Sequence, residues 1–580
     1  MTKSILLAVA IPLTFSSVYA KVQVIPKAEI IVKEVAQNKS QYVLKNAKGT
    51  HLQTSILSQI TPENWFNLSP ADGAEGVSTE EVYKSFGVAQ SEDIVVAVID
   101  SGVDVNHEDL QGKIWINQGE IPDNGIDDDN NGYIDDVFGW NFIGGADGMA
   151  KIVPDDSLSN GLRLIKGKPE AQVDGDTLEI TRELISIKAL KASLESRGET
   201  LSASLSAYLT KLETEVNANV NQAVKVVKDY EAHLKNYKAA VEILKEAGLS
   251  TITLESVRAF EASTSKVQMA KAALVNLLAN GLTEDRINKV LSYYRDQKDI
   301  YYNLDVTKDA RKRVGDNYAD QTEKFYGNND VIGPDSSHGT HVSGSIAAVR
   351  DNNIGIKGVA TNVKIMAIRV VPNGDERDKD VANGIRYAVD NGAKIINMSF
   401  GKAYSPYKKV VDDAMRYAEE KGVLLVHAAG NSNQNNDFAP NFPNRNDLAK
   451  KKEFSNWLEI GASSFQKGLN LPADFSNYGK KSVDFFAPGV DILSTTPDNT
   501  YDTYSGTSMA APTASGVAAL ALSFAPSMDA AAVRSLLIDT SRRYPTLKVN
   551  LPGTETPVLF SSLSIYGTVT DALEAVQAIR

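Results

Sequence analysis

The sequence predicts an α/β protein, in which a doubly wound parallel sheet is interrupted by a large helical insertion. Over residues 94–148 and 326–540, apolar strand-like runs alternate with glycine turns and helical stretches, a spacing typical of parallel sheets. Between these two parts no proline occurs from Glu170 to Gly333, and apolar residues recur at every third or fourth position. That recurrence is the period of amphipathic helices.

Five apolar runs are the expected strands of the sheet. They are Ile94 to Ile99, Val363 to Val371, Ala393 to Met398, Val423 to Ala428 and Trp457 to Ala462. The block at 170–325 is expected to form a bundle of three to five helices. Its glycines at 198, 248 and 281 interrupt the helical period, so they predict helix ends.

Composition excludes several classes of protein. The chain has 580 residues, more than one compact core of ~250–300 residues accommodates. Its net charge of −13 argues against a nucleic-acid partner, because phosphate binding needs a concentrated basic surface. It contains 0 cysteines, which excludes disulfides, thiolate zinc sites and cysteine nucleophiles.

The first twenty residues have the pattern of a secretory signal peptide. Lys3 supplies the positive charge, Ile5 to Phe15 the apolar stretch and Val18-Tyr19-Ala20 a small-residue cleavage site. The alternative is a buried N-terminal helix. The apolar stretch is shorter than the ~20 residues that span a bilayer, and no later segment is long and apolar enough. We expect export to the periplasm or the extracellular medium.

Three short motifs carry chemistry. Asp100 closes the first predicted strand, at the edge where parallel sheets place their ligands. His338 opens His-Gly-Thr-His-Val-Ser-Gly at a helix start, as suits a general base. Ser508 stands in Gly-Thr-Ser-Met-Ala-Ala-Pro before an apolar helix, where the helix dipole favours negative charge. The alternatives without a catalytic role are a turn carboxylate for Asp100 and a serine N-cap for Ser508. His341 is expected to be a packed, hydrogen-bonded histidine.

The order Asp, His, Ser along the chain is that of the subtilisin triad. With these three motifs, residues 89–143 and 326–580 resemble the subtilisin-like serine peptidases, or subtilases. The resemblance implies a subtilisin-like sheet. The helical insertion then lies between the Asp and the His of the triad, which the family joins through only a few tens of residues. It also implies a secreted serine endopeptidase, in which Ser508 attacks the peptide, His338 takes the proton and Asp100 orients the imidazole.

The resemblance extends to the oxyanion hole and the substrate-binding segments. Ala428-Ala429-Gly430-Asn431 matches the segment in which the family places its oxyanion-binding asparagine, so Asn431 takes this role; otherwise it would be a left-handed turn residue. Ser399-Phe400-Gly401 resembles the substrate-pairing strand. With Ala428, Ala429 and Gly430 it would wall the specificity pocket and favour a hydrophobic residue before the cut. After Pro512, Thr-Ala-Ser-Gly stands where the family more often has His-Val-Ala-Gly.

An acidic loop is a candidate for structural Ca²⁺. Its expected ligands lie mostly on alternate residues around a glycine: Asp127, Asp129, Asn131, Tyr133, Asp135 and Asp136. The twelfth position is Phe138 instead of the glutamate of an EF-hand. The alternative is a solvated acidic turn. No cofactor is expected for catalysis.

The expected organisation has five parts: a signal peptide at 1–20, an N-terminal region at 21–88, the peptidase domain at 89–148 and 326–580, and the helical insertion at 149–325. The N-terminal region is either a prosegment or a permanently packed segment. The insertion could be a lid or exosite for substrate proteins, a stalk for self-association or anchoring, or a neutral decoration. Expected partners are protein or peptide substrates. The rival reading is a binding or adhesion protein on an inactive subtilase scaffold.

Overall fold

The computed structural model describes residues 29–33, 41–45, 51–52 and 64–580. The expected signal peptide at 1–20 lies outside the described residues. The chain forms two compact units. The larger contains the chain up to Asp174, Arg313–Val371 and Glu376–Arg580, and the smaller contains Gly175–Lys312 and Pro372–Asp375. Strands β1 (Glu29–Lys33), β2 (Gln41–Lys45) and β3 (His51–Leu52) pair antiparallel.

The larger unit is built on a nine-stranded sheet, in the order β17-β20-β14-β13-β10-β9-β4-β8-β5. The five predicted strands lie next to one another in the middle of this sheet and run parallel. They are β4 (Ile94–Asp100), β8 (Val363–Arg369), β9 (Ile395–Met398), β10 (Leu424–Ala428) and β13 (Trp457–Ser463). The predicted α/β class is therefore confirmed. The flanking strands are β5 (Gly139–Asn141), β14 (Phe485–Pro488), β17 (Arg542–Arg543) and β20 (Thr568–Val569).

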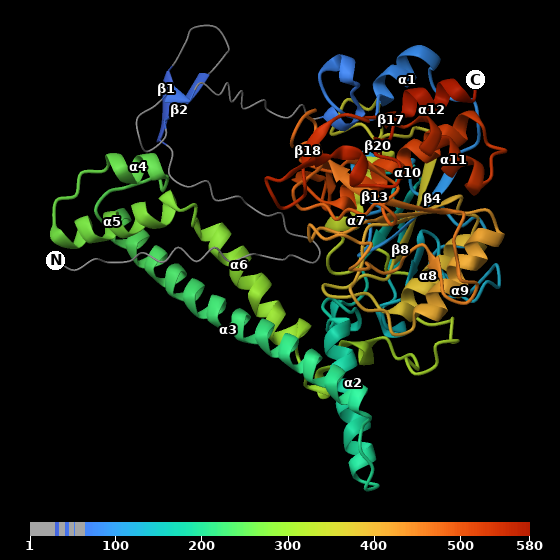
Figure 1. Ribbon diagram of the computed structural model, residues 1–580, viewed down its shortest axis with the longest axis horizontal. Coiled ribbons are helices and arrows are strands. Elements are labelled where there is room, and N and C mark those ends of the chain that lie inside the picture. The colour runs from blue at the N-terminus through green and yellow to red at the C-terminus, as the bar shows by residue number, and fades with distance from the viewer. Residues whose placement is uncertain (1–28, 34–40, 46–50, 53–63) are drawn as a thin grey trace. The chain divides into compact units, whose positions relative to one another are not determined.

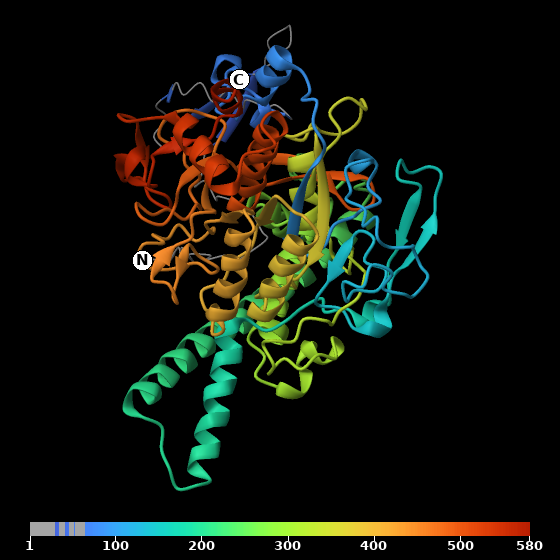
Figure 2. The same ribbon diagram turned by 90° about the vertical axis from the view of Figure 1, so that its right-hand side faces the viewer.

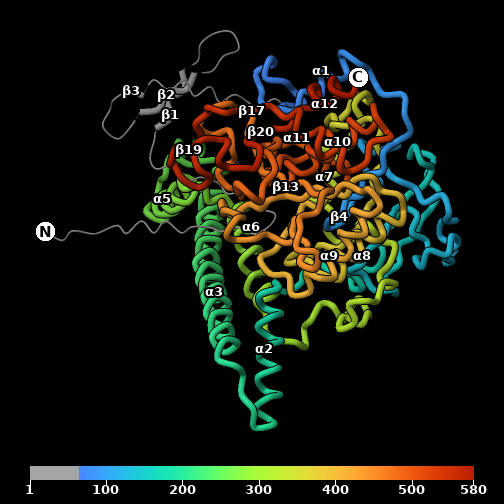
Figure 3. The backbone as a smooth tube through the Cα atoms, turned by 45° about the vertical axis from the view of Figure 1, so that its right-hand side comes forward, coloured from blue at the N-terminus to red at the C-terminus, as the bar shows by residue number. Residues whose placement is uncertain are grey.

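Helices cover both faces of this sheet. Figure 3 shows α7 and α10 on one side of β4, and α8 and α9 on the other; α8 and α9 lie side by side in Figure 2 as well. Val96 and Val98 of β4 share a core cluster with residues of α10, whereas Ile99 points toward Gly384 of α8. Alternate side chains of one strand thus enter opposite layers. The four helices are α7 (Ser337–Ala347), α8 (Asp378–Asp390), α9 (Lys408–Glu420) and α10 (Thr507–Phe524).

The segment at 64–88 is packed into the core of the larger unit. Trp65 and Phe66 are both 0% exposed. The Trp65 indole N–H donates to the carbonyls of Val490 and Asp491, each at 3.2 Å. Helix α1 (Thr79–Phe86) follows. Two buried aromatic side chains of this size anchor a segment strongly, since each removes a large apolar surface from water.

The smaller unit is helical. It contains α2 (Glu179–Glu195), α3 (Ala203–Glu246), α4 (Leu254–Ala259), α5 (Ser265–Ala279) and α6 (Glu284–Asp296). The long α3 packs along α5 and α6 (Figure 1). The glycines at 198, 248 and 281 have positive φ angles of 73°, 104° and 70° and follow α2, α3 and α5. They end these helices because glycine adopts the left-handed conformation without steric cost.

This helical unit is shorter than the expected range of 149–325. Strands β6 (Lys151–Pro154) and β7 (Leu162–Ile165) pair as a hairpin, and their Ile152 and Leu164 join the core of the larger unit. These residues precede the proline-free, helix-period stretch. The chain rejoins the larger unit at Arg313.

Further strands and α-helices of the larger unit lie outside the nine-stranded sheet. They are β11 (Asn446–Asp447), β12 (Lys452–Glu453), β15 (Ile492–Thr496), β16 (Thr500–Tyr504), α11 (Ala530–Thr540), β18 (Lys548–Asn550), β19 (Pro557–Leu559) and α12 (Ala572–Ala578). Among the helices that the structure describes, none has the length and apolar character needed to cross a membrane.

Candidate active site

Asp100 and His338 meet at the carboxyl edge of the sheet. Asp100 is the last residue of β4, and His338 lies in the first turn of α7. The His338 Nδ1 atom is 2.8 Å from Asp100 Oδ1. Gly339 permits this approach, because a Cβ atom there would lie 2.1 Å from the carbonyl oxygen of Gly102. Helix α7 can therefore come close enough to the strand end for a direct imidazole–carboxylate contact.

The surroundings of His338 raise its pKa above 6.5. Burial opposes the charged imidazolium, but the Asp100 carboxylate outweighs this effect through its charge and its hydrogen bond. Asp335 adds a smaller effect in the same direction. Asp100 itself is 1% exposed and accepts the Ser101 N–H at 2.7 Å. The carboxylate is thus fixed in the orientation that holds the imidazole.

Ser508 lies in the first turn of α10. Its Oγ donates to the carbonyl of Ser399 at 3.0 Å, and within the described chain no hydrogen bond joins it to His338. Catalytic hydrogen bonds are often absent or long before substrate binds.

Two hydrogen-bond donors, Asn431 Nδ2 and the backbone N–H of Ser508, converge beside the Ser508 side chain. The Thr507 N–H and Oγ1 both contact Asn431 Oδ1, at 2.8 and 2.9 Å. A backbone N–H can only donate, so the contacted atom is the amide oxygen and Asn431 Nδ2 faces away. A Cβ position built at Gly506 lies 3.5 Å from Asn431 Nδ2 and 3.6 Å from the Ser508 nitrogen. The Ser508 N–H has no intrahelical partner, because it lies in the first turn of α10. This N–H and Asn431 Nδ2 can therefore both donate to an anion beside Ser508. Sequence reasoning missed the orienting role of Thr507.

The two expected wall segments border Ser508. Ser399, Phe400 and Gly401 directly follow β9, and Ala428, Ala429 and Gly430 lie at the end of β10. Besides accepting from Ser508 Oγ, Ser399 donates its hydroxyl to the Ser508 carbonyl at 2.9 Å. The Gly430 N–H donates to Thr507 Oγ1 at 3.0 Å. Phe400 is 7% exposed and its ring packs edge-on against His427.

A buried polar chain supports the first of these segments and was not predicted. Asn397 Nδ2 donates to Ser399 Oγ at 2.9 Å, and Ser515 Oγ donates to Asn397 Oδ1 at 2.9 Å. Both Asn397 and Ser515 are 0% exposed. Ser515 stands where the family more often has alanine, so this difference in sequence supplies the hydrogen bond that the Asn397 amide oxygen accepts.

The acidic loop brings together only part of the predicted ligand set. Carboxylate oxygens of Asp127 and Asp129 lie within 4.8 Å of each other and of Glu120. Asp135 lies outside this cluster and accepts the backbone N–H groups of the turn at 124–125, at 3.1 and 2.9 Å. Asp136 is 0% exposed; burial raises its pKa to about 6. It bonds to Tyr387 OH at 2.5 Å and to Asn117.

Of the other two predicted ligands, Asn131 uses its side-chain atoms for hydrogen bonds within the loop, and the Tyr133 side chain is buried. The Asn131 amide donates to Asp129 and Asp136, at 3.2 and 3.1 Å, and its Oδ1 accepts the Tyr133 N–H at 2.8 Å. The Tyr133 ring packs against Trp140, with centroids 5.0 Å apart. Glu120 was missed because it precedes the alternating pattern and no residue spacing marks it.

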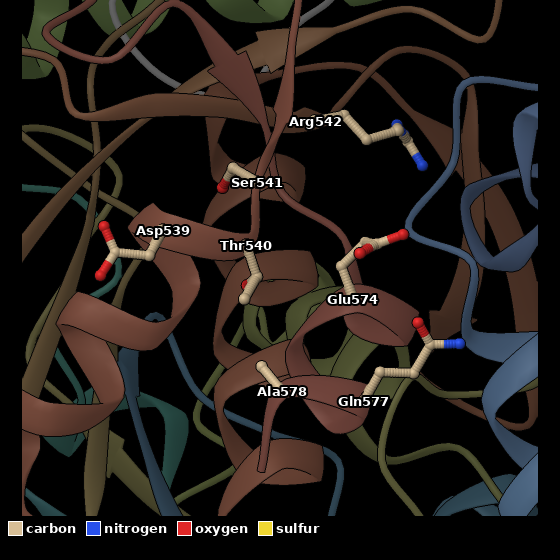
Figure 4. Close-up of a pocket in the computed structure, with 7 residues that line it drawn as sticks. All are labelled: Asp539, Thr540, Ser541, Arg542, Glu574, Gln577 and Ala578. Atoms are coloured by element: carbon tan, nitrogen blue, oxygen red, sulfur yellow. The ribbon is translucent and has the colours of Figure 1, made fainter. Parts of the chain in front are cut away.

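A pocket of about 530 Å³ lies elsewhere in the larger unit (Figure 4). Its lining residues come from the ends of α11 and α12 and the segment between them: Asp539, Thr540, Ser541, Arg542, Glu574, Gln577 and Ala578. It includes none of the predicted catalytic, substrate-binding or metal residues.

A parallel sheet with an Asp-His pair at its carboxyl edge and a serine at a helix start is the arrangement of the subtilisin-like class of proteins. Residues 91–556 match the model described as the subtilase family. The chain belongs to this family.

Three relatives show the extent of the similarity. The thermophilic serine proteinase of Bacillus sp. (strain AK1) is 41% identical over 186 residues, which are 32% of this chain and 42% of that protein. Subtilisin DY of Bacillus licheniformis is 38% identical over 209 residues, 36% of this chain and 70% of that protein. Thermitase of Thermoactinomyces vulgaris is 40% identical over 214 residues, 36% of this chain and 71% of that protein. The chain therefore spans less than half the length of the first relative.

Proposed function

We propose that this protein is an exported serine endopeptidase that hydrolyses peptide bonds in proteins through Asp100, His338 and Ser508. The observation that carries the proposal is the 2.8 Å contact between His338 and Asp100, at the same sheet edge as the donors beside Ser508. This arrangement supplies a base, a group that orients the base, and an anion-binding position next to a nucleophile.

The reaction follows from these positions. Ser508 Oγ attacks the scissile carbonyl carbon while His338 takes its proton, and Asp100 stabilises the resulting imidazolium through Nδ1–H. The tetrahedral oxyanion accepts hydrogen bonds from Asn431 Nδ2 and the Ser508 N–H. His338 then gives its proton to the leaving amine, so the C–N bond breaks and an acyl-enzyme remains. Water attacks the ester in the same way and releases Ser508.

Labelling with a fluorophosphonate tests this proposal against the rival, a binding or adhesion protein on an inactive scaffold. We expect covalent modification of Ser508 in the wild-type protein, located by mass spectrometry of the labelled peptide. A folded protein that remains unlabelled and cleaves no protein substrate would support the rival.

Replacing Asn431 with alanine is expected to lower kcat by about 10²–10³-fold with little change in KM, because its amide binds the oxyanion more strongly than the ground-state carbonyl. Steady-state kinetics on a chromogenic peptide measure both constants. Asn444→Ala is the control, since the Asn444 side chain accepts from the Asn446 N–H and lies outside the donor pair. Equal losses in the two variants would contradict the oxyanion role.

The converging carboxylates of Glu120, Asp127 and Asp129 fit a structural Ca²⁺ ion. Ca²⁺ prefers oxygen ligands, and three anionic groups this close repel one another unless a cation lies between them. Glu120, Asp127 and Asp129 would hold the ion; it would join the segment at 120 to the loop at 127–129 and take no part in catalysis.

Removal of calcium is expected to lower the melting temperature, because an ion that binds only the folded state stabilises it. Differential scanning calorimetry with and without a chelator measures the change. The Glu120→Gln variant should lose this dependence, whereas Asp135→Asn should keep it, since Asp135 lies outside the cluster. A wild-type melting temperature that is the same with calcium and with chelator would contradict a structural ion.

The same proposal makes helices α2–α6 an insertion in the catalytic domain. This insertion lies between the Asp and the His of the triad. The chain leaves the larger unit after Asp174 and returns at Arg313, both between Asp100 and His338. Export rests on the pattern at residues 1–20. N-terminal sequencing of the exported protein should show a start at Lys21 or later, and a start at Met1 would contradict cleavage of a signal peptide.

A further inference from the structure

Arg369 is a buried cation at the carboxyl edge of the sheet. It is the last residue of β8 and lies opposite Asp100 of β4 in the parallel pairing. Arg369 is 2% exposed, and its three side-chain nitrogens donate to three separate segments: Nε to the Ser101 carbonyl at 2.8 Å, Nη1 to Asn141 Oδ1 at 3.3 Å and Nη2 to the Val173 carbonyl at 2.6 Å. The planar guanidinium fork can hold three partners in this way, whereas an ammonium group cannot keep the same geometry.

Ser101 connects Arg369 to the carboxylate of Asp100. The Ser101 N–H donates to Asp100 Oδ1 at 2.7 Å, and the same oxygen is 2.8 Å from His338 Nδ1. The Ser101 carbonyl accepts from Arg369, so both polar backbone groups of Ser101 are bonded. Because Arg369 holds one of these two groups, it restrains the backbone that orients the carboxylate oxygen.

Arg369 also packs against the segment that leads to His338. A Cβ atom at Gly333 would lie 2.3 Å from Arg369 Nε, and Gly333 has a positive φ of 62°. Only glycine leaves room for the guanidinium at this position, and glycine also adopts this backbone conformation without steric cost. Gly333 precedes His338 in the same segment. Arg369 therefore lies between the chain that follows Asp100 and the chain that precedes His338.

Carboxylates balance the buried charge of Arg369. Burial lowers the pKa of Arg369 to about 10, against the opposing charges of Asp330, Asp174 and Asp335, so the guanidinium stays charged at neutral pH. Asp335 also favours the charged form of His338. The cation and the imidazole thus share the influence of one carboxylate, and a substitution of Arg369 can change both the charge and the geometry of the site.

We propose that Arg369 is a positioning residue for the Asp100–His338 pair. Its guanidinium holds the turn after Asp100 against the segment that precedes His338, and so keeps the carboxylate oxygen at hydrogen-bond distance from the imidazole. Arg369 acts through these backbone contacts and not by touching the substrate. This inference rests on the proposed endopeptidase function.

The test measures kcat and the pH profile of kcat/KM on a peptide p-nitroanilide, per active site titrated with the fluorophosphonate. We expect Arg369→Met to lower kcat by about 10²-fold, the scale of loss that a small misplacement of a catalytic group causes. The acidic limb should move to lower pH, because His338 loses the Asp100 contact that raises its pKa. Loss of the Arg369 charge by itself would move this limb to higher pH, so the direction of the shift separates orientation from charge.

Two further variants calibrate this result. Arg369→Lys keeps the charge and loses the fork, so it should shift the limb in the same direction by less and lower kcat by about tenfold. Arg534→Met is the matched control. Arg534 Nε also donates to a backbone carbonyl, that of Trp457, at 2.7 Å, but Trp457 begins β13 and so lies at the opposite edge of the sheet. This control should lower the melting temperature and leave the limb and the kcat per active site unchanged.

The outcomes separate this inference from the proposed function. An Arg369→Met limb that moves to higher pH or does not move overturns the positioning role. An Arg369→Lys variant with the wild-type kcat and limb also overturns it, since the charge alone would then suffice. The lysine variant decides the question if circular dichroism shows that Arg369→Met does not fold. Labelling of Ser508 in the wild-type protein is independent of these results, and its absence overturns the endopeptidase function itself.

Discussion

Replacing Ser508 with alanine is expected to lower kcat by about 10⁶-fold, the scale of loss when the nucleophile of such a triad is removed. Without the Oγ atom no acyl-enzyme forms, and His338 has no hydroxyl from which to take a proton. The remaining rate comes from water attacking a substrate that is still held beside the Asn431 and Ser508 N–H donors. Substrate binding should change little, because the Ser508 backbone is unaltered.

The measurement is steady-state hydrolysis of a peptide p-nitroanilide, together with the pre-steady-state burst that an accumulating acyl-enzyme produces. Ser505→Ala is the matched control: it removes a hydroxyl three residues earlier, one that contacts Asp491 and not the site. The control should retain near wild-type kcat. A Ser508→Ala variant with a few per cent of wild-type kcat or more would show that another residue is the nucleophile.

The fold class could be predicted because the central strands are predominantly apolar runs. β4 and β13 have seven residues each, and a strand buried on both faces shows an apolar run that a sequence displays directly. The outer strands could not be identified in this way. β5 has three residues and β20 has two, and such short strands form because a neighbour offers hydrogen bonds, which local sequence does not show.

The residues of the candidate site likewise differ in whether local sequence could identify them. Asp100, His338 and Ser508 stand in motifs whose chemistry is local, at a strand end or a helix start. Glu120 and Asn397 make their contacts through tertiary structure. Glu120 meets a loop seven or more residues later, and the Asn397 amide oxygen accepts a hydrogen bond from Ser515 of α10. No spacing in the sequence encodes either contact, so both required the structure.

Replacing Asp100 with asparagine is expected to lower kcat by about 10⁴-fold, because an amide holds the imidazole in the wrong tautomer and cannot stabilise the imidazolium. It should also shift the pH dependence. The base acts when His338 is neutral, so kcat/KM rises with pH through the pKa of His338 in the free enzyme. Asp100 raises this pKa above 6.5. Without its charge, burial remains and lowers the pKa, so the acidic limb moves to lower pH.

Asp335→Asn provides the matched control for this shift. Asp335 also raises the pKa of His338, but by its charge alone and less than Asp100 does, and its carboxylate accepts the Ser337 N–H at 2.9 Å, a bond that asparagine can keep. This variant should show a smaller displacement of the acidic limb in the same direction, with near wild-type kcat at high pH. The profile of kcat/KM from pH 4 to 9 distinguishes the two residues, since the plateau falls only when the lost carboxylate also holds the imidazole tautomer. An Asp100→Asn profile with an unchanged plateau would contradict the orienting role of Asp100, and one with a lowered plateau but an unmoved limb would contradict its electrostatic role.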